Sequence, residues 1–234
     1  MSDTASGLLT IGVLVIALAL AHVPLGKRIA AVFADSRHWR VEGVVYRLAR
    51  IDPESEQRWS TYAISVLAFS AVGVGLLFVL IVAQDLLPLG RGATMHWDTA
   101  LTTAVSFVTN TNWQSYAGEQ GASALVQTVG LTVQNFASPA VGLAVAVALV
   151  RGLARSRSGT LGNFWVDLVR GVIRILLPLA LVGAVVLLLG GVVENLTGPA
   201  TVTTLSGGSQ VLPGGLVASQ EAGLAPGSWT RGGI

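Results

Sequence analysis

The amino-acid sequence predicts an all-α membrane protein, in which transmembrane helices hold a re-entrant pore helix and the filter loop that follows it. The first observation is composition: 52% of the 234 residues are hydrophobic and only 11% are charged, whereas soluble domains average roughly 25% charged residues. The second is a set of uncharged apolar runs that approach the length needed to cross about 30 Å of hydrocarbon. The third is a short, polar, uncharged segment between two of these runs.

Residues 7–23 form the first apolar run, which is at the lower limit of length for a membrane span. Its small residues imitate the cleavage site of a signal peptide, but the segment before it holds Asp3 and no Lys or Arg. A signal peptide needs a positively charged N-terminal region. We therefore expect residues 1–25 to form an extra N-terminal transmembrane helix that is retained.

Residues 26–60 form a polar segment whose basic residues are Lys27, Arg28, Arg37, Arg40, Arg47, Arg50 and Arg58. We place it on the cytoplasmic side, because Lys and Arg next to spans mark that side. Residues 40–47 have the pattern of a surface helix with an apolar stripe, which is suited to lie along the membrane and contact lipid. A nucleic-acid partner is not expected, since acids are interspersed with the basic residues and aromatic residues are few.

Three further runs, residues 61–83, 124–150 and 175–193, are free of charged residues and complete a multi-pass protein. Five arginines lie in the segment 151–174, whereas the loop after the second run has only one basic residue and the segment 194–220 has none. The basic-residue rule therefore puts residues 151–174 inside and the N-terminus outside. Asp167 and Arg174 are seven residues apart, a spacing that allows a same-face pair at the inner membrane edge.

Residues 97–108 are helix-permissive but too short to span a membrane. Asp98 lies where a carboxylate would favour the start of a helix. If this segment crossed fully, the arginine-rich segment would move outside and the charge rule would fail. We therefore expect a re-entrant pore helix, followed by non-helical backbone that protein or water must satisfy at membrane depth.

The candidate ion site follows this short helix and consists of Val108, Thr109, Asn110, Thr111 and Asn112. Such a strip offers five carbonyl oxygens on an extended backbone, and carbonyls of this kind replace the hydration shell of potassium in filters. Carboxylates, which a divalent cation would require, are absent from the strip. The alternative interpretation is a plain extracellular turn rich in Thr and Asn.

Three nearby side chains are candidates for supporting roles. Gln114 lies directly beyond the strip, and Gln134 and Asn135 lie in the polar first half of the third apolar run. The latter pair are candidates for lining the same cavity. Their alternative role is to hydrogen-bond neighbouring helices, which is worth about 0.6 kcal/mol per bond in membranes.

The sequence shows no catalytic constellation. It has neither a Gly-x-x-x-x-Gly-Lys-Ser/Thr phosphate loop nor a cluster with metal-ligand spacing, and it contains no cysteine. We therefore expect a non-enzymatic subunit without a covalent cofactor, whose energy comes from a partner or an ion gradient.

At this point the residues resemble a known family. Residues 106–116, SFVTNTNWQSY, closely resemble the first selectivity-filter segment of the KdpA family, the potassium-binding subunits of bacterial Kdp potassium-transporting ATPases. Further similar stretches are GLTVQNF at 130–136, TLGNFWVDL at 160–168, VASQEA at 217–222, IDPE at 51–54, and Trp59. The resemblance covers nearly the whole chain up to about residue 222.

The resemblance implies a fold of four membrane–pore loop–membrane repeats around one filter, preceded by an extra N-terminal span. Residues 61–153 would be the first repeat and residues 154–222 the start of the second. The strip 108–112 would be the first filter strand, with Gln114 beside it. Extracellular potassium would pass through the filter to a P-type ATPase subunit, which hydrolyses ATP in a complex that also holds small accessory subunits. The location would be the bacterial plasma (inner) membrane.

Residues 223–234 depart from the family pattern, which continues into a glycine-rich second filter strand. We expect a truncated or frame-shifted chain, and one quarter of a four-part ring is not expected to transport potassium alone. Two other interpretations remain open. One is a channel-like or symporter-type potassium transporter without an ATPase partner, whose uptake would follow membrane potential and ignore ATP. The other is a non-functional membrane fragment of a disrupted gene, which genomic sequencing would identify.

Overall fold

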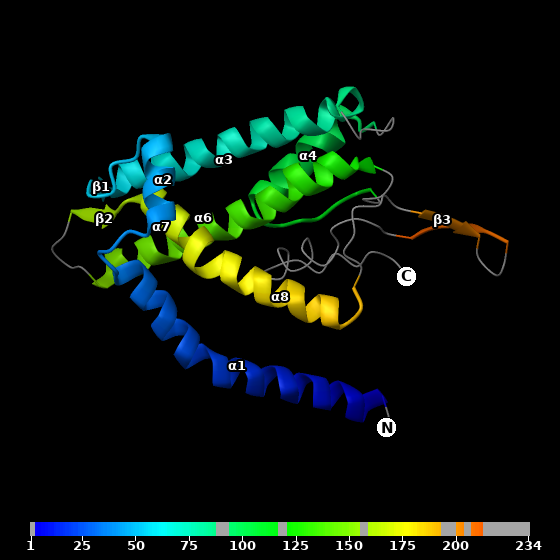
Figure 1. Ribbon diagram of the computed structural model, residues 1–234, viewed down its shortest axis with the longest axis horizontal. Coiled ribbons are helices and arrows are strands. Elements are labelled where there is room, and N and C mark those ends of the chain that lie inside the picture. The colour runs from blue at the N-terminus through cyan, green and yellow to red at the C-terminus, as the bar shows by residue number, and fades with distance from the viewer. Residues whose placement is uncertain are drawn as a thin grey trace.

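The structure, a computed structural model, describes residues 3–87, 94–116, 121–154, 159–192, 200–203 and 207–212. Within these residues, four helical stretches are long and apolar enough to cross a membrane: Thr4–Ala34, Trp59–Val82, Val126–Ala154 and Phe164–Leu189. Figure 1 shows three of them gathered in a bundle, with the first standing to one side. The predicted all-α membrane fold is therefore confirmed. The tail 223–234 lies outside the described residues.

The first helix, α1 (Asp3–Ala34), is longer than the predicted span and carries Lys27 and Arg28 as part of the helix. The helix predicted at residues 1–25 therefore continues into the basic segment 26–60 as far as Ala34. Pro24 lies inside α1, and Figure 1 shows the helix bending along its length, as a proline that removes a backbone hydrogen bond favours. Beyond the bend, Val32 and Phe33 pack against the bundle.

The second helix, α2 (Arg40–Ala49), runs across the long direction of the bundle at the end where α1 finishes (Figure 1). It begins where the backbone N–H of Trp39 donates to the Glu42 carboxylate at 2.8 Å. It ends at Arg50, which adopts a left-handed conformation with φ 55°. The surface helix predicted at residues 40–47 is therefore present.

Two antiparallel helices form the centre of the bundle. Helix α3 (Trp59–Val82) continues into a short 3-10 helix, η1 (Gln84–Leu86), and a π-helical turn, η2 (Val126–Leu131), leads into α6 (Thr132–Ala154). Pro139 lies inside α6. At one end a small antiparallel pair, β1 (Gln57–Arg58) with β2 (Thr160–Gly162), ties the start of α3 to the chain that follows α6.

The fourth span begins earlier than predicted. Helix α7 (Phe164–Arg170), the π-helical turn η3 (Gly171–Leu176) and α8 (Leu177–Leu189) follow one another without a break. Asn163 starts this stretch, because its side-chain oxygen accepts a hydrogen bond from the N–H of Trp165 at 3.0 Å, as an N-cap residue does. The prediction that the loop extends to Arg174 is therefore wrong, since the second half of that segment is helical.

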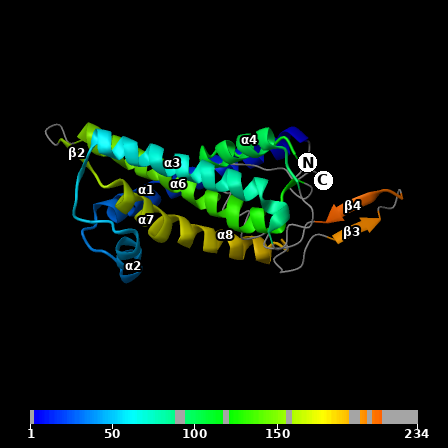
Figure 2. The same ribbon diagram turned by 90° about the horizontal axis from the view of Figure 1, so that it is seen from above.

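A second hairpin, β3 (Ala200–Thr203) with β4 (Ser209–Leu212), follows the fourth span. Figure 2 shows it beyond the ends of the bundle, whereas α3, α6 and α8 run side by side. The bundle is joined by two apolar clusters. One lies between α3, α6 and α7, where Ala140, Ala144 and Ala148 of α6 face Tyr62 and Phe164. Small residues at such positions let membrane helices approach closely. The other cluster lies around α4, described below.

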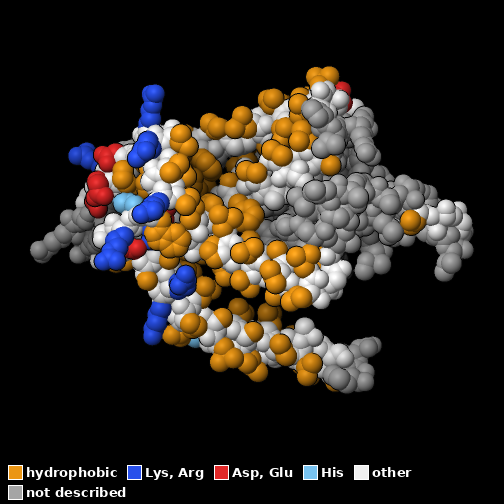
Figure 3. Space-filling model, in the orientation of Figure 1, with side chains coloured by type: hydrophobic (Ala, Val, Ile, Leu, Met, Phe, Trp, Pro, Cys, Tyr) orange, Lys and Arg blue, Asp and Glu red, His pale blue; other side chains and the backbone are white. Residues whose placement is uncertain are grey.

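Charged side chains gather at the end of the molecule that carries α2, as Figure 3 shows. Asp167 of α7 is buried there and forms a two-pronged pair with Arg151, with distances of 2.6 and 3.0 Å, while the Tyr62 hydroxyl donates to it at 3.1 Å. Asp167 therefore pairs with Arg151, and the same-face pair with Arg174 that the sequence spacing allowed is not formed. Arg174 lies within the wide turn η3, so the two-turn spacing of an α-helix does not hold between the two residues.

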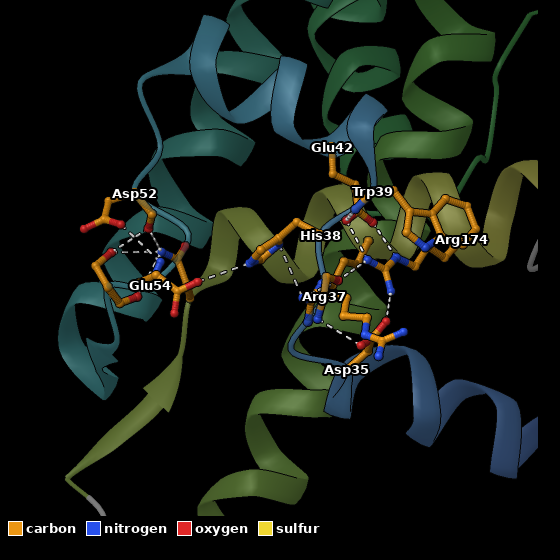
Figure 4. Close-up of polar contacts among 11 residues, drawn as sticks. Asp35, Arg37, His38, Trp39, Glu42, Asp52, Glu54 and Arg174 are labelled. Atoms are coloured by element: carbon orange, nitrogen blue, oxygen red, sulfur yellow. Dashed lines mark hydrogen bonds and ion pairs between the residues drawn. The ribbon is translucent and has the colours of Figure 1, made fainter.

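Arg174 instead pairs with two acids that lie far away in the sequence (Figure 4). Its Nη2 donates to Glu42 Oε2 at 2.6 Å and its Nη1 donates to Asp35 Oδ2 at 2.7 Å. The guanidinium also lies 4.8 Å from the centre of the Trp39 ring, a cation–π distance. This cluster fixes α2 and the residues after α1 to the fourth span.

Acidification is expected to weaken this attachment through Glu42. Burial raises the pKa of Glu42, but hydrogen bonds from Arg174 and from the Trp39 N–H outweigh it, so the pKa lies below its ordinary value of 4.5. Because the folded protein binds this proton less readily than the unfolded chain, the contribution is complete above about pH 4.5 and is lost as pH falls through the folded pKa.

Thermal unfolding in detergent between neutral pH and about pH 3.5 measures this effect. Glu42→Gln has no carboxyl to titrate, so its melting temperature should fall less steeply over that range than that of the unaltered protein. Parallel pH profiles for the two proteins would show that Glu42 does not contribute.

Candidate functional site

The chain enters the bundle as the short helix α4 (Trp97–Val108). After this helix it turns back toward the end from which it entered. Gln84, just after α3, donates from Nε2 to the Gly121 carbonyl at 3.1 Å and accepts from the Ser123 N–H at 2.8 Å. The end of α3 is therefore held against the start of the third span. Figure 1 shows α4 starting at this end and the green trace after it running back to it. The re-entrant geometry predicted from the charge rule is thus present.

One side of α4 is packed against the bundle. Ala100, Ala104 and Phe107 are buried with Leu77 and Ile81 of α3. At the outer end, His96 precedes the helix and Asp98 lies in its first turn. The Asp98 carboxylate accepts a hydrogen bond from the Thr99 N–H, so the acid predicted at this helix start is placed where it satisfies a free N–H.

The end of α4 has the hydrogen bonds of a Schellman motif. Asn110 is left-handed, with φ 58°, and its N–H donates to the Phe107 carbonyl at 3.3 Å. The N–H of Thr111 donates to the Ser106 carbonyl at 2.9 Å. These two bonds close a helix end, with Asn in the position that glycine usually takes.

The predicted extended backbone over 108–112 is therefore wrong: Val108 is the last residue of α4, Thr109 has φ −84° and ψ 3°, and Asn110 is left-handed. Asn112 is also left-handed, with φ 55°, because asparagine tolerates this region better than most residues. Ser106 fixes the chain beyond it: the Trp113 N–H donates to Ser106 Oγ at 2.8 Å, and Ser106 Oγ lies 3.1 Å from the Trp113 carbonyl. The strip is a tight turn closed onto the last turn of α4.

This turn leaves main-chain oxygens available. Among the described residues, the carbonyls of Val108, Thr109, Asn110 and Thr111 accept no hydrogen bond. The Thr109 hydroxyl donates to the Val105 carbonyl at 2.9 Å and lies 3.0 Å from that of Thr111. Carbonyls at the C-terminal end of a helix carry the negative end of its dipole, so this site favours a cation without a carboxylate.

Helix α6 holds the turn in place. Ser138 Oγ donates to Asn110 Oδ1 at 3.3 Å and lies 2.9 Å from the Gln134 carbonyl, one helical turn earlier. Gln134 lies near the strip 108–112 beside α3, since a methyl group added at Gly73 would lie 3.4 Å from both Gln134 Oε1 and Val108 Cγ2. The predicted strip and the predicted residue Gln134 are thus brought together.

Asn135 is buried in α6, with only 2% of its surface exposed. Neither its amide nitrogen nor its amide oxygen has a hydrogen-bond partner among the described residues. A buried amide without partners costs about 1–3 kcal/mol, so this side chain calls for a ligand, a water molecule or a protein group. Gln114 is half-buried beyond the strip, and within the described part of the chain its side chain makes no hydrogen bond.

Sequence reasoning missed Ser106 and Ser138. The signal for Ser138 was available, since it follows Gln134 by four residues and therefore lies on the same side of the helix. The signal for Ser106 was weaker, because its role depends on the turn geometry that brings Trp113 back to it.

Together, the bundle of membrane-competent helices and the short helix α4, whose last carbonyls accept no hydrogen bond from the described residues, fit a membrane protein of the pore-loop class. The sequence profile described as "Potassium-transporting ATPase A subunit" matches residues 12–228. The chain belongs to this family, so the resemblance seen in the sequence is confirmed.

Named relatives agree with the profile, and each is called a potassium-transporting ATPase potassium-binding subunit. The protein from Kineococcus radiotolerans is 57% identical over 223 residues, which is 95% of this chain and 40% of the relative. Those from Streptomyces coelicolor and Mycolicibacterium smegmatis are each 54% identical, over 94% and 95% of this chain and 40% and 41% of the relative. The chain thus spans about two fifths of the length of these relatives.

Proposed function

We propose that the protein acts as the potassium-binding and translocating subunit of an ATP-driven potassium uptake complex. It is non-catalytic, and a P-type ATPase subunit that binds it hydrolyses ATP, with small accessory subunits completing the complex. Potassium, the transported ion, enters from outside through the filter and passes to the ATPase subunit. The names of the relatives support the ion and the complex, and no ligand other than the ion is required.

The observation that carries the proposal is the set of four carbonyls, at Val108, Thr109, Asn110 and Thr111, that accept no hydrogen bond from the residues that the structure describes. Uncharged oxygens can replace the water around a monovalent cation and still release it, whereas carboxylates would hold it. Gln134 and Asn135 extend this polar surface along α6 toward the interior. The unpartnered amide of Asn135 supports a place for it beside the ion or its water.

One loop supplies only part of a filter. Potassium filters surround the ion with carbonyls from several loops, four in potassium channels. In this proposal the other oxygens come from family segments outside the two fifths spanned here, and residues 61–153 are the first of the repeats that contribute them. Residues 1–234 alone are then not expected to bind potassium selectively.

The proposed orientation follows the charges. Basic side chains lie at the end that carries α2 (Figure 3), and the pore loop enters from the opposite end. Positive charge is retained on the cytoplasmic side of membranes. The loop and the N-terminus would then face outward from a bacterial plasma membrane.

Gln114→Arg tests the proposal in the complete subunit with its ATPase partner. A permanent cation beside the strip repels potassium, so the potassium concentration for half-maximal ATP hydrolysis and uptake should rise at least about tenfold, which corresponds to about 1.4 kcal/mol. Ser115→Arg, at an exposed neighbouring position, is the matched control and should change it little.

Three results bear on the proposal. Equal affinities for Gln114→Arg, Ser115→Arg and the unaltered subunit would remove Gln114 from the ion path. Uptake that continues without ATP and follows membrane potential would favour a channel or symporter. ATP hydrolysis in the complex that does not respond to potassium would overturn the proposed function itself.

A further inference from the structure

Helix α2 buries a charged side chain and exposes aliphatic ones, which is the opposite of the pattern on a surface helix of a soluble protein. Its buried residues are Glu42, which is 0% exposed, and Tyr46. Its exposed face carries Val41, Val44 and Leu48, the last 81% exposed. These three side chains follow the i, i+3, i+7 spacing of one helical stripe. A charged residue inside and an aliphatic stripe outside indicate that the outer face does not meet water.

Basic side chains lie along this helix. Arg40, Arg47 and Arg50 are all exposed. Among the residues that the structure describes, no carboxylate lies within 4 Å of any of the three. On a helical projection, Arg40 and Arg47 fall on one edge of the aliphatic stripe. An apolar stripe bordered by cations is the pattern of a helix that lies in a membrane interface.

The helix is held in the orientation that such a role requires. Figure 1 shows α2 running across the direction of the spans, and thus along the membrane plane that the spans define. The pair between Glu42 and Arg174 fastens its inner face to η3 (Figure 4). The Tyr46 ring makes an edge contact with His38, with centroids 5.4 Å apart. The aliphatic stripe is therefore turned away from the bundle.

We propose that α2 is an interfacial helix that binds anionic phospholipid in the cytoplasmic leaflet. Val41, Val44 and Leu48 insert among the upper acyl chains, and the arginines bind the phosphate of the headgroups. Charge complementarity selects this occupant, since three guanidinium groups that pair with no carboxylate in the described part of the chain favour a negatively charged surface. The choice of leaflet rests on the orientation proposed above, but the membrane contact does not depend on potassium transport.

Depth-dependent fluorescence quenching tests the contact. Residues 1–234 contain no cysteine, so an environment-sensitive fluorophore can be attached at Leu48→Cys or Ala49→Cys in the complete subunit, without other reactive cysteines and with its ATPase partner. Brominated lipids in the bilayer should quench the label at position 48 strongly. Ala49 is exposed on another side of the helix, so the label at position 49 should respond mainly to aqueous iodide.

Lipid selectivity is read from the same label. Brominated phosphatidylglycerol should quench the label at position 48 more strongly than brominated phosphatidylcholine. Each exposed arginine contributes about 1 kcal/mol next to an anionic membrane. Each of Arg40→Gln, Arg47→Gln and Arg50→Gln should therefore lower the preference about five-fold at low salt. Arg58→Gln, in β1, is the control.

The outcomes show whether lipid, protein or water lies against the aliphatic stripe of α2. A label at position 48 that is shielded from both iodide and brominated lipid is covered by protein, and one that iodide quenches fully is in water; either result overturns the proposal. Equal quenching by the two brominated lipids overturns the lipid selectivity. Since none of these readings involves potassium, their failure leaves the proposed transport function untouched.

Discussion

Replacing Arg174 with alanine is expected to destabilise the protein by about 3–5 kcal/mol, because it leaves a buried carboxylate without its counter-charge. The side chain of Arg174 is 3% exposed and that of Glu42 is 0% exposed. Two of its nitrogens donate to the Glu42 carboxylate and a third to Asp35. The same guanidinium donates to the Arg37 carbonyl at 2.6 Å, so its loss also frees the connection between α1 and α2.

Thermal and denaturant unfolding in detergent, followed by the loss of helical circular dichroism, measures this change. Arg40→Ala removes an exposed arginine from the same region and should stay within about 0.5 kcal/mol of the unaltered protein. The double variant Glu42→Gln with Arg174→Gln removes both charges and should lose less than Arg174→Ala alone. If Arg174→Ala were no less stable than Arg40→Ala, the cluster would not fasten α2 to the bundle.

Replacing Asn110 with valine in the complete subunit is expected to lower potassium affinity at least about tenfold. Among the substitutions in this Discussion, it is the one expected to affect function directly. Asn110 is left-handed, a conformation that costs an ordinary L-residue roughly 1–2 kcal/mol and a β-branched one more. Valine would move the Val108, Thr109 and Thr111 carbonyls away from their present positions. It would also lose the hydrogen bond from Ser138.

Asn110→Gly separates these two causes. Glycine adopts the left-handed conformation readily, so it should keep the turn and lose only the side-chain bonds that Asn110 accepts from Ser138 and Asn112. Ser138→Ala removes the first of these bonds from the other side and should resemble Asn110→Gly. Potassium-dependent ATP hydrolysis gives the affinity of each variant. Equal affinities for Asn110→Val and Asn110→Gly would show that the backbone conformation of this turn does not set the ion site.

The spans could be predicted from the sequence because uncharged apolar runs leave few alternatives. The bounds of the spans could not be predicted, because each predicted span stops short of the nearest charged residue. Charged residues can also lie within a helix. Arg170 and Arg174 are 5% and 4% exposed and lie within the helical stretch that Asn163 begins. Arg174 pairs with Asp35 and Glu42, and Arg170 donates to the Arg37 carbonyl. These partners come from elsewhere in the chain, and no local pattern identifies them.

The strip 108–112 was proposed as a filter from its polar, uncharged composition, but its conformation could not be predicted. Asparagine is common in both extended and left-handed backbone, so the letters alone do not decide between them. The left-handed conformation of Asn110 is fixed by the Schellman hydrogen bonds and by Ser138, which lies 28 residues after Asn110 in the chain. The ion-binding roles of Val108, Thr109, Asn110, Thr111, Asn112, Gln114, Gln134 and Asn135 remain predictions.

The wide turn at Val126–Leu131 sets the rotational phase of the span that follows it. A π-helical turn accommodates one residue more than an α-helical turn, and one residue corresponds to about 100° of rotation. Deleting a single residue there would let the turn close into ordinary α-helix, and both ends of the span could stay where they are. Ser138 and Asn135 would then keep their places, whereas closing the turn without a deletion would rotate them by about 100°, away from the loop that follows α4. The orientation of this polar face is therefore decided by a residue count several positions upstream of the residues that form it.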